Sequence, residues 1–213
     1  QRDDIAAVIL EPTGASWGQV PIGESFLHEL RSLTAENGQV LIFDEVVSGF
    51  RCSPGGAQGH FGIKPDLTTL AKVLAGGFPG GAMVGRKEIL DFLDHEASAA
   101  AGREKVAHQG TFNANPISAA AGTTALGIVA ETDVCQRAND YAARLREALT
   151  RMLKDENVDW CVYGTFSGFH IFTNPDHDAV TAETINAGEY DYAKLKKSAG
   201  SELTTKLRVG MLT

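Results

Sequence analysis

The amino-acid sequence predicts an α/β protein in which a mostly parallel sheet is followed by a smaller α+β portion. Two apolar runs, at residues 5–10 and 40–43, each end at acidic residues, and a segment with helical spacing separates them. Runs that are apolar throughout are typical of parallel strands, which are buried on both faces. The composition fits a globular protein, since 43% of the 213 residues are hydrophobic and 22% are charged.

The first half of the chain should form a strand–helix–strand unit and then further strands. The apolar side chains at residues 24–36 recur at helical spacing, so a helix is expected between the strands at 5–10 and 40–43. The elements predicted after this unit are strands at 67–70 and 82–84, a short helix at 86–93 and a mobile loop at 97–105.

The second half should begin with two helices. One helix is expected from Asn115-Pro116 to about Ala130, and Thr132-Asp133 can cap another. The apolar stripe expected on that second helix consists of Ala138, Ala142, Leu145, Leu149 and Met152. Residues 160–173 are rich in aromatic and β-branched side chains and predict paired strands, followed by helices. We therefore expect 1–131 to be part of a large domain, and 132–213 to hold a linking helix and part of a small C-terminal domain.

Charge and cysteine content exclude several classes of function. The net charge of −8 argues against nucleic-acid binding. Three separated cysteines without a CxxC pattern indicate reduced thiols and a cytoplasmic protein. The histidines do not follow the H-E-x-x-H spacing, so we predict no metal site. No apolar run is long enough for a membrane span. Because the chain starts at Gln1 and ends without a capping signal, we expect a segment of a longer protein.

Asp44 and Lys72 are the residues most suggestive of chemistry. Asp44 follows a predicted strand directly, and ligands of open parallel sheets bind at the carboxyl ends of strands. Lys72 follows another predicted strand and precedes four glycines, which allow close approach of the backbone to a ligand. An apolar setting favours the uncharged amine, which can form a Schiff base with an aldehyde. The structural alternatives for Asp44 are a helix N-cap or an ion pair with Arg51, and the alternative for Lys72 is a side chain that extends into solvent.

The pair of residues indicates more than either one alone. A pyridoxal cofactor needs an amine for its aldehyde and a carboxylate for its pyridinium nitrogen. A lysine and an aspartate at one edge of a sheet would satisfy both requirements.

Three segments of the sequence resemble class III aminotransferases: IFDEVVSGFR, GIKPDLTTLAKVLAGGFPGGAMVG and HQGTFNANPISAAAG. Within that class they are most similar to glutamate-1-semialdehyde aminomutases and their transaminase relatives, from about Ala7 to Gly122. The resemblance implies the type I fold of pyridoxal-phosphate-dependent transferases, with pyridoxal 5'-phosphate as cofactor. It also implies a homodimer with shared active sites. The reaction implied moves an amino group from an amino-acid-like donor to a carbonyl acceptor, or within one molecule.

The same resemblance implies a role for four residues. Lys72 would form the Schiff base and move the proton between the substrate carbon and the cofactor. Asp44 would pair with the pyridinium nitrogen, and Val46 would pack on one face of the ring. Strand alternation is consistent with this, since positions 44 and 46 would point the same way. Thr111 would bind the phosphate, in this family usually from the neighbouring subunit.

The chain departs from the family pattern in two respects. Ser16 stands where many members carry Glu or Asn, and Trp17 beside it would line the substrate entrance or only pack. In addition, the Gly-rich phosphate loop and the ring-stacking aromatic residue of the family lie upstream of Gln1. Half of the cofactor pocket would then be missing from this chain.

Three other interpretations are open at this point. GASWG, residues 14–18, fits the G-x-S-x-G pattern of a serine hydrolase using Ser16, with Asp44 and His108 as possible partners, although no strand or helix adjoins it directly. VLIFDE resembles a Walker B strand in which Glu45 activates water, although the sequence has no P-loop. The third interpretation is a catalytically incomplete fragment that serves only as an assembly domain.

Overall fold

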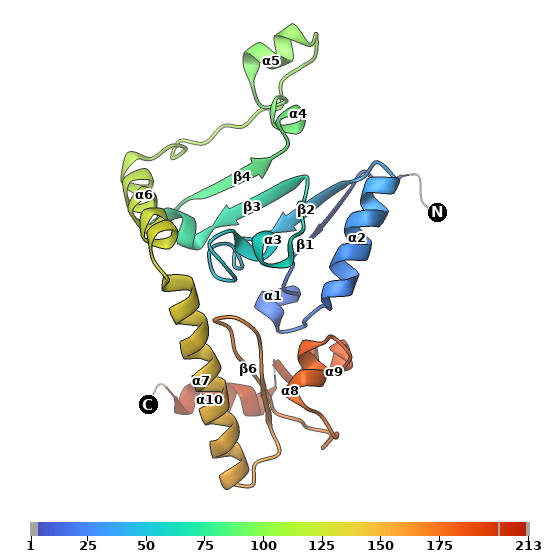
Figure 1. Ribbon diagram of the computed structural model, residues 1–213, viewed down its shortest axis with the longest axis vertical. Coiled ribbons are helices and arrows are strands. Elements are labelled where there is room, and N and C mark those ends of the chain that lie inside the picture. The colour runs from blue at the N-terminus through green and yellow to red at the C-terminus, as the bar shows by residue number, and fades with distance from the viewer. Residues whose placement is uncertain (1–3, 200, 212–213) are drawn as a thin grey trace.

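A computed structural model of the protein describes residues 4–199 and 201–211. A four-stranded sheet occupies the first half of the chain, a two-stranded sheet lies in the second half, and a long helix links the two (Figure 1). Within the described ranges, no helix is both long and apolar enough to cross a lipid bilayer.

The main sheet confirms the predicted α/β class with mostly parallel strands. Its strands are β1 (Ala7–Leu10), β2 (Val40–Asp44), β3 (Leu67–Ala71) and β4 (Gly81–Gly85), in that order across the sheet. The first three strands run parallel, and β4 is antiparallel to β3. All four strands were expected from the sequence, with bounds that differ by one or two residues.

One face of this sheet is covered by helices. Helix α2 (Glu24–Glu36) has the predicted bounds, and its Leu27 and Leu30 pack against Leu41 and Phe43 of β2. Ile63, just after α3 (Gly56–Phe61), completes the same core cluster. Apolar residues at helical spacing on α2 thus meet alternate residues of β2, as the periodicity of each element requires.

The opposite face does not show the two-sided burial that the apolar runs predicted. Ile9 and Met83 point to this face, and they are 60% and 43% exposed. The apolar runs do form parallel strands, as predicted. The helices described above cover the face that packs against α2, whereas Ile9 and Met83 on the other face are exposed.

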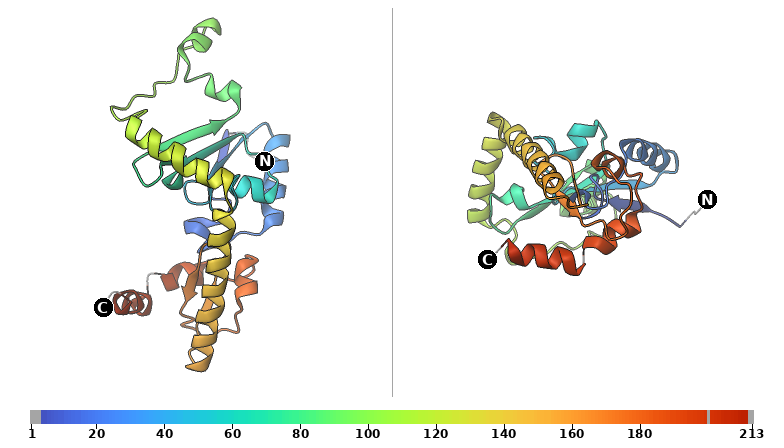
Figure 2. Two further views of the ribbon diagram at one scale, coloured as in Figure 1. Left: turned by 60° about the vertical axis from the view of Figure 1, so that its left-hand side comes forward. Right: turned by 90° about the horizontal axis from the view of Figure 1, so that it is seen from below.

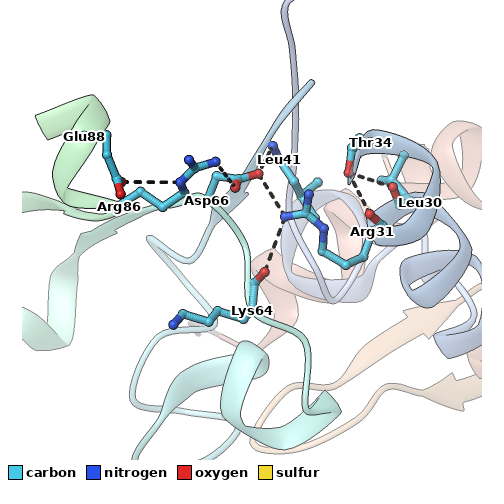
Figure 3. A network of polar contacts seen from close by, with 8 residues as sticks. All are labelled: Leu30, Arg31, Thr34, Leu41, Lys64, Asp66, Arg86 and Glu88. Carbon is cyan, nitrogen blue, oxygen red and sulfur yellow. Dashed lines mark hydrogen bonds and ion pairs between the residues drawn. The ribbon is translucent and has the colours of Figure 1, made fainter. Parts of the chain in front are cut away.

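Asp66 anchors the start of β3 to three other parts of the fold (Figure 3). Its carboxylate accepts hydrogen bonds from the Arg31 guanidinium of α2 at 2.8 Å and from the Leu41 amide of β2 at 2.8 Å. Arg86, directly after β4, donates to the other oxygen at 3.2 Å. One buried carboxylate therefore fixes a helix and two strands relative to β3.

The region between β3 and the linking helix is more helical than expected. Its elements are the 3-10 helix η1 (Lys72–Ala75), α4 (Lys87–Leu90), α5 (His95–Ala100) and α6 (Pro116–Glu131). The prediction of a loop at 97–105 is wrong for its first residues, which belong to α5. Alanine favours helix, and the Asp94 side chain caps the first turn by accepting from the Ala97 amide at 2.7 Å.

Helices α6 and α7 (Val134–Asp155) confirm the two helices predicted for residues 115–155. The Asn115 side chain caps α6 by accepting from the amides of Ile117 and Ser118. The predicted stripe on α7 is only partly right, because Met152 is exposed while Leu153 is buried. The start of α7 contacts the loop after β2, and a later part contacts the turn between β5 and β6. The buried residues of α7 therefore do not follow a single stripe.

The C-terminal unit confirms the predicted paired strands. β5 (Cys161–Tyr163) and β6 (His170–Phe172) are antiparallel, and the helices that follow are α8 (Ala182–Asn186), α9 (Tyr192–Ala199) and α10 (Glu202–Gly210). Tyr163, Phe172, Ile185 and Leu195 form its core. Figure 2 shows α7 running from the main sheet down alongside this unit.

Candidate functional site

The carboxyl edge of the parallel strands brings Asp44 and Lys72 to the same side of the sheet. Asp44 is the last residue of β2 and pairs in register with Thr69 of β3. Lys72 follows the end of β3 as the first residue of η1. Because parallel strands end at one edge, both residues lie where open α/β sheets bind their ligands.

Asp44 is held by hydrogen bonds to one of its two carboxylate oxygens. Oδ1 accepts from the Val46 amide at 3.1 Å and from the Thr69 hydroxyl at 3.2 Å. Within the described residues, no hydrogen bond reaches Oδ2. Arg51 donates to the Val47 carbonyl, and no ion pair joins it to Asp44 in the described part of the chain. The ion-pair alternative is therefore wrong, and one oxygen of an oriented carboxylate stays available.

Val46 occupies its position for a different reason from the one expected. β2 ends at Asp44, so Val46 lies in the following turn and strand alternation does not apply to it. The Asp44 side chain orients the Val46 backbone instead, by accepting its N–H. A short polar side chain that bonds the amide two residues later is a common way to form such a turn.

Lys72 has an unusual backbone and an open side chain. Its φ of 53° lies in the left-handed region, which disfavours side chains other than glycine's. Contrary to the expectation of an apolar setting, the side chain is exposed, and the described residues form no ion pair with it. Strained residues of this kind concentrate at functional sites.

Two of the glycines in this region serve the packing of η1 against α6. A methyl group at Gly76 would lie 2.5 Å from the Ala121 carbonyl oxygen, and one at Gly122 would lie 2.6 Å from that of Leu74. The expectation that the glycines after Lys72 admit a ligand is therefore wrong for Gly76. Gly77, by contrast, faces open space with a φ of 93°.

Glu45 is fully used inside the protein. Its side chain is 1% exposed and accepts hydrogen bonds from the amides of Ala57 and Gln58 at the start of α3 and from the Ser48 hydroxyl. A carboxylate in this position stabilises the positive end of a helix. The Walker B interpretation thus loses the residue that would activate water.

The segment after β1 does not form a nucleophile elbow. β1 ends at Leu10, and Ser16 lies in the short helix α1 (Ala15–Gly18) with a φ of 54°. The Glu11 carboxylate accepts the Ser16 amide at 2.9 Å and the Trp17 amide at 3.0 Å. No hydrogen bond joins Ser16 to His108 in the parts of the chain described, so the serine hydrolase finds no support.

Thr111 is exposed and lies between α5 and α6 in the sequence. Figure 1 shows the loop that connects these two helices. A hollow of about 730 Å³ lies near this loop, and its lining comes from η1, residues 79–81, the loop before α6 and α6 itself. None of Asp44, Lys72 and Thr111 lines it. Within one chain the structure thus brings Asp44, Val46 and Lys72 to one edge and gives no contact from Thr111 to them.

Sequence reasoning missed Thr69 as a partner of Asp44. Its hydroxyl is the only side-chain donor to that carboxylate among the described residues. The register of β2 and β3 would have revealed it, but a register is not readable from two separate apolar runs.

The fold and this edge define an α/β protein with a lysine and an aspartate that both lie at the carboxyl ends of parallel strands. The chain belongs to the class-III aminotransferase family, whose model matches residues 1–192. It is 42% identical over 171 residues to the glutamate-1-semialdehyde 2,1-aminomutase of Methanosarcina acetivorans, which covers 80% of this chain and 39% of that protein. The chain thus spans about two fifths of the length of the curated relatives it matches.

Solved structures show the same fold. An omega-transaminase from Sphaerobacter thermophilus superimposes with a TM-score of 0.72 at 35% identity, covering 92% of this chain and 40% of that one. A structure described as a transaminase with PLP bound gives a TM-score of 0.71 at 32% identity, with 81% and 39% covered. These matches confirm the resemblance and the fold expected from the sequence.

Proposed function

We propose that this chain carries the lysine and the aspartate of a pyridoxal-phosphate-dependent aminotransferase. The observation that carries the proposal is the register of β2 and β3, which brings Asp44 and Lys72 to one edge of the sheet. Family membership and the transaminase relatives support the same activity.

The residues at this edge fit pyridoxal phosphate by their chemistry. The cofactor needs a primary amine, and Lys72 offers one that is exposed. It also needs a carboxylate oxygen for its ring nitrogen, and Oδ2 of Asp44 accepts no hydrogen bond from the described residues. When bound, the cofactor supplies a protonated ring that withdraws electrons from the substrate carbon.

Each residue would have one task. Lys72 would hold the cofactor's aldehyde and, once free, remove a proton from the substrate and return it. Asp44 would keep the ring nitrogen protonated, and the bonds from Val46 and Thr69 would orient its carboxylate for that purpose. Val46 would contact the ring.

The substrates would be an amino-acid-like donor and a carbonyl acceptor. Transfer within one molecule is the second candidate, because the curated relatives carry the name glutamate-1-semialdehyde 2,1-aminomutase. Incubation of the loaded enzyme with an amino donor alone distinguishes the two. An intermolecular transaminase would release a carbonyl product and leave its cofactor aminated, whereas a mutase would return an isomer of its substrate.

The working assembly would be a homodimer in the cytoplasm. Thr111 would then reach the cofactor phosphate of the neighbouring subunit, which agrees with its lack of contact with Asp44 and Lys72 in its own chain. The three cysteines are free thiols, as a reducing compartment requires.

The test is to map the cofactor attachment in the intact protein. Borohydride makes a lysine–cofactor linkage permanent, and peptide mapping should place it on Lys72. Lys72→Ala should abolish the linkage and reduce turnover by a factor on the order of 10⁴ or more, because attachment and proton transfer both depend on the amine.

Lys64→Ala is the matched control. Lys64 is an exposed lysine that precedes the opposite, amino end of β3. The Lys64→Ala variant should keep both the lysine–cofactor linkage and the turnover of the wild-type protein. A linkage on another lysine, or full activity in Lys72→Ala, would contradict the proposal.

A further inference from the structure

The segment from Glu11 to Gln19 has a backbone that needs external support. Ser16 and Trp17 are consecutive non-glycine residues in the left-handed region, with φ of 54° and 61°. Such a conformation is unfavourable for a residue that carries a Cβ atom. The successive amides of Ser16 and Trp17 converge on the Glu11 carboxylate, which holds one side of the segment.

The C-terminal hairpin holds the other side of this segment. The Tyr163 hydroxyl donates to the Gln19 carbonyl at 2.7 Å. His170 Nε2 lies 3.0 Å from the Trp17 carbonyl oxygen, so this nitrogen must carry the hydrogen. Two side chains of β5 and β6 thus bind the backbone of a loop from the main sheet.

The indole of Trp17 fits a space that only glycine leaves open. A methyl group at Gly168 would lie 2.2 Å from the indole nitrogen. Arg146 of α7 donates to the carbonyls of Phe166 and Gly168 at 2.9 and 2.6 Å, which fixes the hairpin turn.

An aromatic contact extends the same interface to α3. The Phe166 ring lies 6.4 Å from the Trp17 ring and 4.7 Å, edge-on, from that of His60. Phe166 also has a positive φ, of 52°, so two strained non-glycine residues, Trp17 and Phe166, meet in this contact. Strained residues of this kind concentrate at functional sites, so a role beyond packing is indicated.

This segment leads to the carboxyl edge that carries Asp44. Leu10 pairs in register with Phe43, so Glu11 begins the segment at the strand position beside Asp44. Ser16 is exposed, and its backbone amide donates a hydrogen bond to the Glu11 carboxylate. The next residue in the chain is Trp17.

We propose that Trp17 is a positioning residue through which the C-terminal hairpin sets the Ser16 segment at the cofactor edge. Its effect on the cofactor rests on the proposed function, whereas the coupling between the hairpin and the segment does not. The carbonyl and indole of Trp17 face the hairpin, and its amide faces Glu11, so displacement of the hairpin must displace Ser16.

The coupling is tested by hydrogen exchange in the intact protein without cofactor. Gly168→Ala should make the peptide containing residues 11–19 exchange about tenfold faster, because the indole must leave its site. The double variant Trp17→Phe/Gly168→Ala should restore slower exchange, since the smaller ring leaves room for the methyl group. Gly210→Ala is the matched control, because a methyl group there meets nothing within 4 Å.

The effect on the site is tested with pyridoxal 5'-phosphate as the probe. Gly168→Ala should raise its Kd about tenfold and shift its visible absorbance, and the double variant should reverse both changes. Tyr163→Phe, which loses only the bond to Gln19, should act in the same direction with a smaller effect and serves if Gly168→Ala does not fold.

Two results would overturn the inference. Unchanged exchange of residues 11–19 in folded Gly168→Ala would show that the hairpin does not hold the segment. Faster exchange with unchanged cofactor affinity and absorbance would show that the segment does not act on the site. If the wild-type protein attaches no cofactor at Lys72, the proposed function fails, and the exchange result still decides the coupling.

Discussion

Asp44 and Glu45 are neighbouring acids with opposite surroundings. Glu45 is buried and saturated by the amides that begin α3 and by Ser48, so it serves the fold. Asp44, one residue earlier, uses one oxygen for a turn and for Thr69 and keeps the other oxygen at the strand edge. The difference lies in what each side chain contacts: the start of α3 surrounds Glu45, whereas Asp44 contacts Thr69 and the Val46 amide.

The charge of Asp44 should matter more than its shape. Asp44→Asn keeps an oxygen for the bonds from Val46 and Thr69, so the protein should fold and still bind pyridoxal phosphate. Turnover should fall by about 100-fold or more, because a neutral amide does not hold the ring nitrogen protonated. Steady-state kinetics and cofactor absorbance measure the two effects.

Thr69→Val is the milder companion variant. It removes one bond to Asp44 and leaves the carboxylate charge, so it should reduce turnover by less than Asp44→Asn does. Equal losses in both variants would show that orientation, and not charge, limits the reaction.

At the residue scale, the sequence alone led to Asp44 and Lys72 because each follows a strand-like run. It did not reveal the surroundings of either residue. The exposure of Lys72 depends on what packs around η1, and the turn at Val46 depends on a bond from the Asp44 side chain. Such features arise from tertiary contacts, which no local pattern encodes.

At the element scale, η1 and α6 approach each other closely beside the site. Gly122 allows it, because a side chain there would meet the Leu74 carbonyl oxygen. Gly122→Ala should lower the free energy of unfolding by about 1–3 kcal/mol through this clash. Urea denaturation of the intact protein measures the change.

Gly127→Ala, on the same helix, is its control. A methyl group at Gly127 meets nothing within 4 Å, so the higher helix propensity of alanine should stabilise the protein by about 0.5–1 kcal/mol. Destabilisation by both variants would point to helix bending instead of a local clash.

Asp66 should make the stability of the main sheet sensitive to acid. Burial alone would raise the pKa of Asp66, but the bonds from Leu41, Arg31 and Arg86 outweigh it and lower the pKa below the ordinary 3.8. Its contribution to stability is therefore fully present above pH 3.8 and is lost as the pH falls through the lower value in the folded state.

Asp66→Asn should lower the free energy of unfolding at pH 7 by about 2 kcal/mol and flatten its decline in acid. Urea denaturation at several pH values measures both effects. Asp91→Asn, which breaks the Lys87–Asp91 pair on the surface of α4, should cost less than about 1 kcal/mol. A steep acid decline that survives in Asp66→Asn would place the sensitivity elsewhere.

The elements themselves were largely predictable from periodicity. The bounds of α2 agree with the prediction, and Asn115-Pro116 marked the start of α6 through a cap that the structure confirms. The miss at α5 came from treating a run of alanines as a loop. The exposure of the sheet face opposite α2 could not be predicted, because an apolar strand pattern does not reveal which segment covers it.

At the scale of the whole molecule, the separation of Thr111 from Asp44 and Lys72 leads to a test of shared active sites. If the protein is the proposed homodimer, the Lys72→Ala and Thr111→Val variants should each be nearly inactive. Mixed dimers should regain activity if Thr111 acts across the interface, because one of their two sites then contains both native residues.

Refolding the two variants together and assaying the mixture measures this recovery. Refolding each variant alone is the control. If Thr111 acts within its own chain, every site of a mixed dimer carries one defect and the mixture stays inactive.

Helix α7 limits how this molecule can be divided. Near its start, Cys135 and Asn139 donate to backbone carbonyls of the loop after β2, and further along Arg146 donates to carbonyls of the C-terminal hairpin. A proteolytic nick or a permuted terminus within 134–155 would part these donors from one set of acceptors. Even a boundary at residues 132–133 would leave the N-terminal piece without the donors Cys135 and Asn139. Two separately expressed halves should therefore be more stable when mixed than when either is alone.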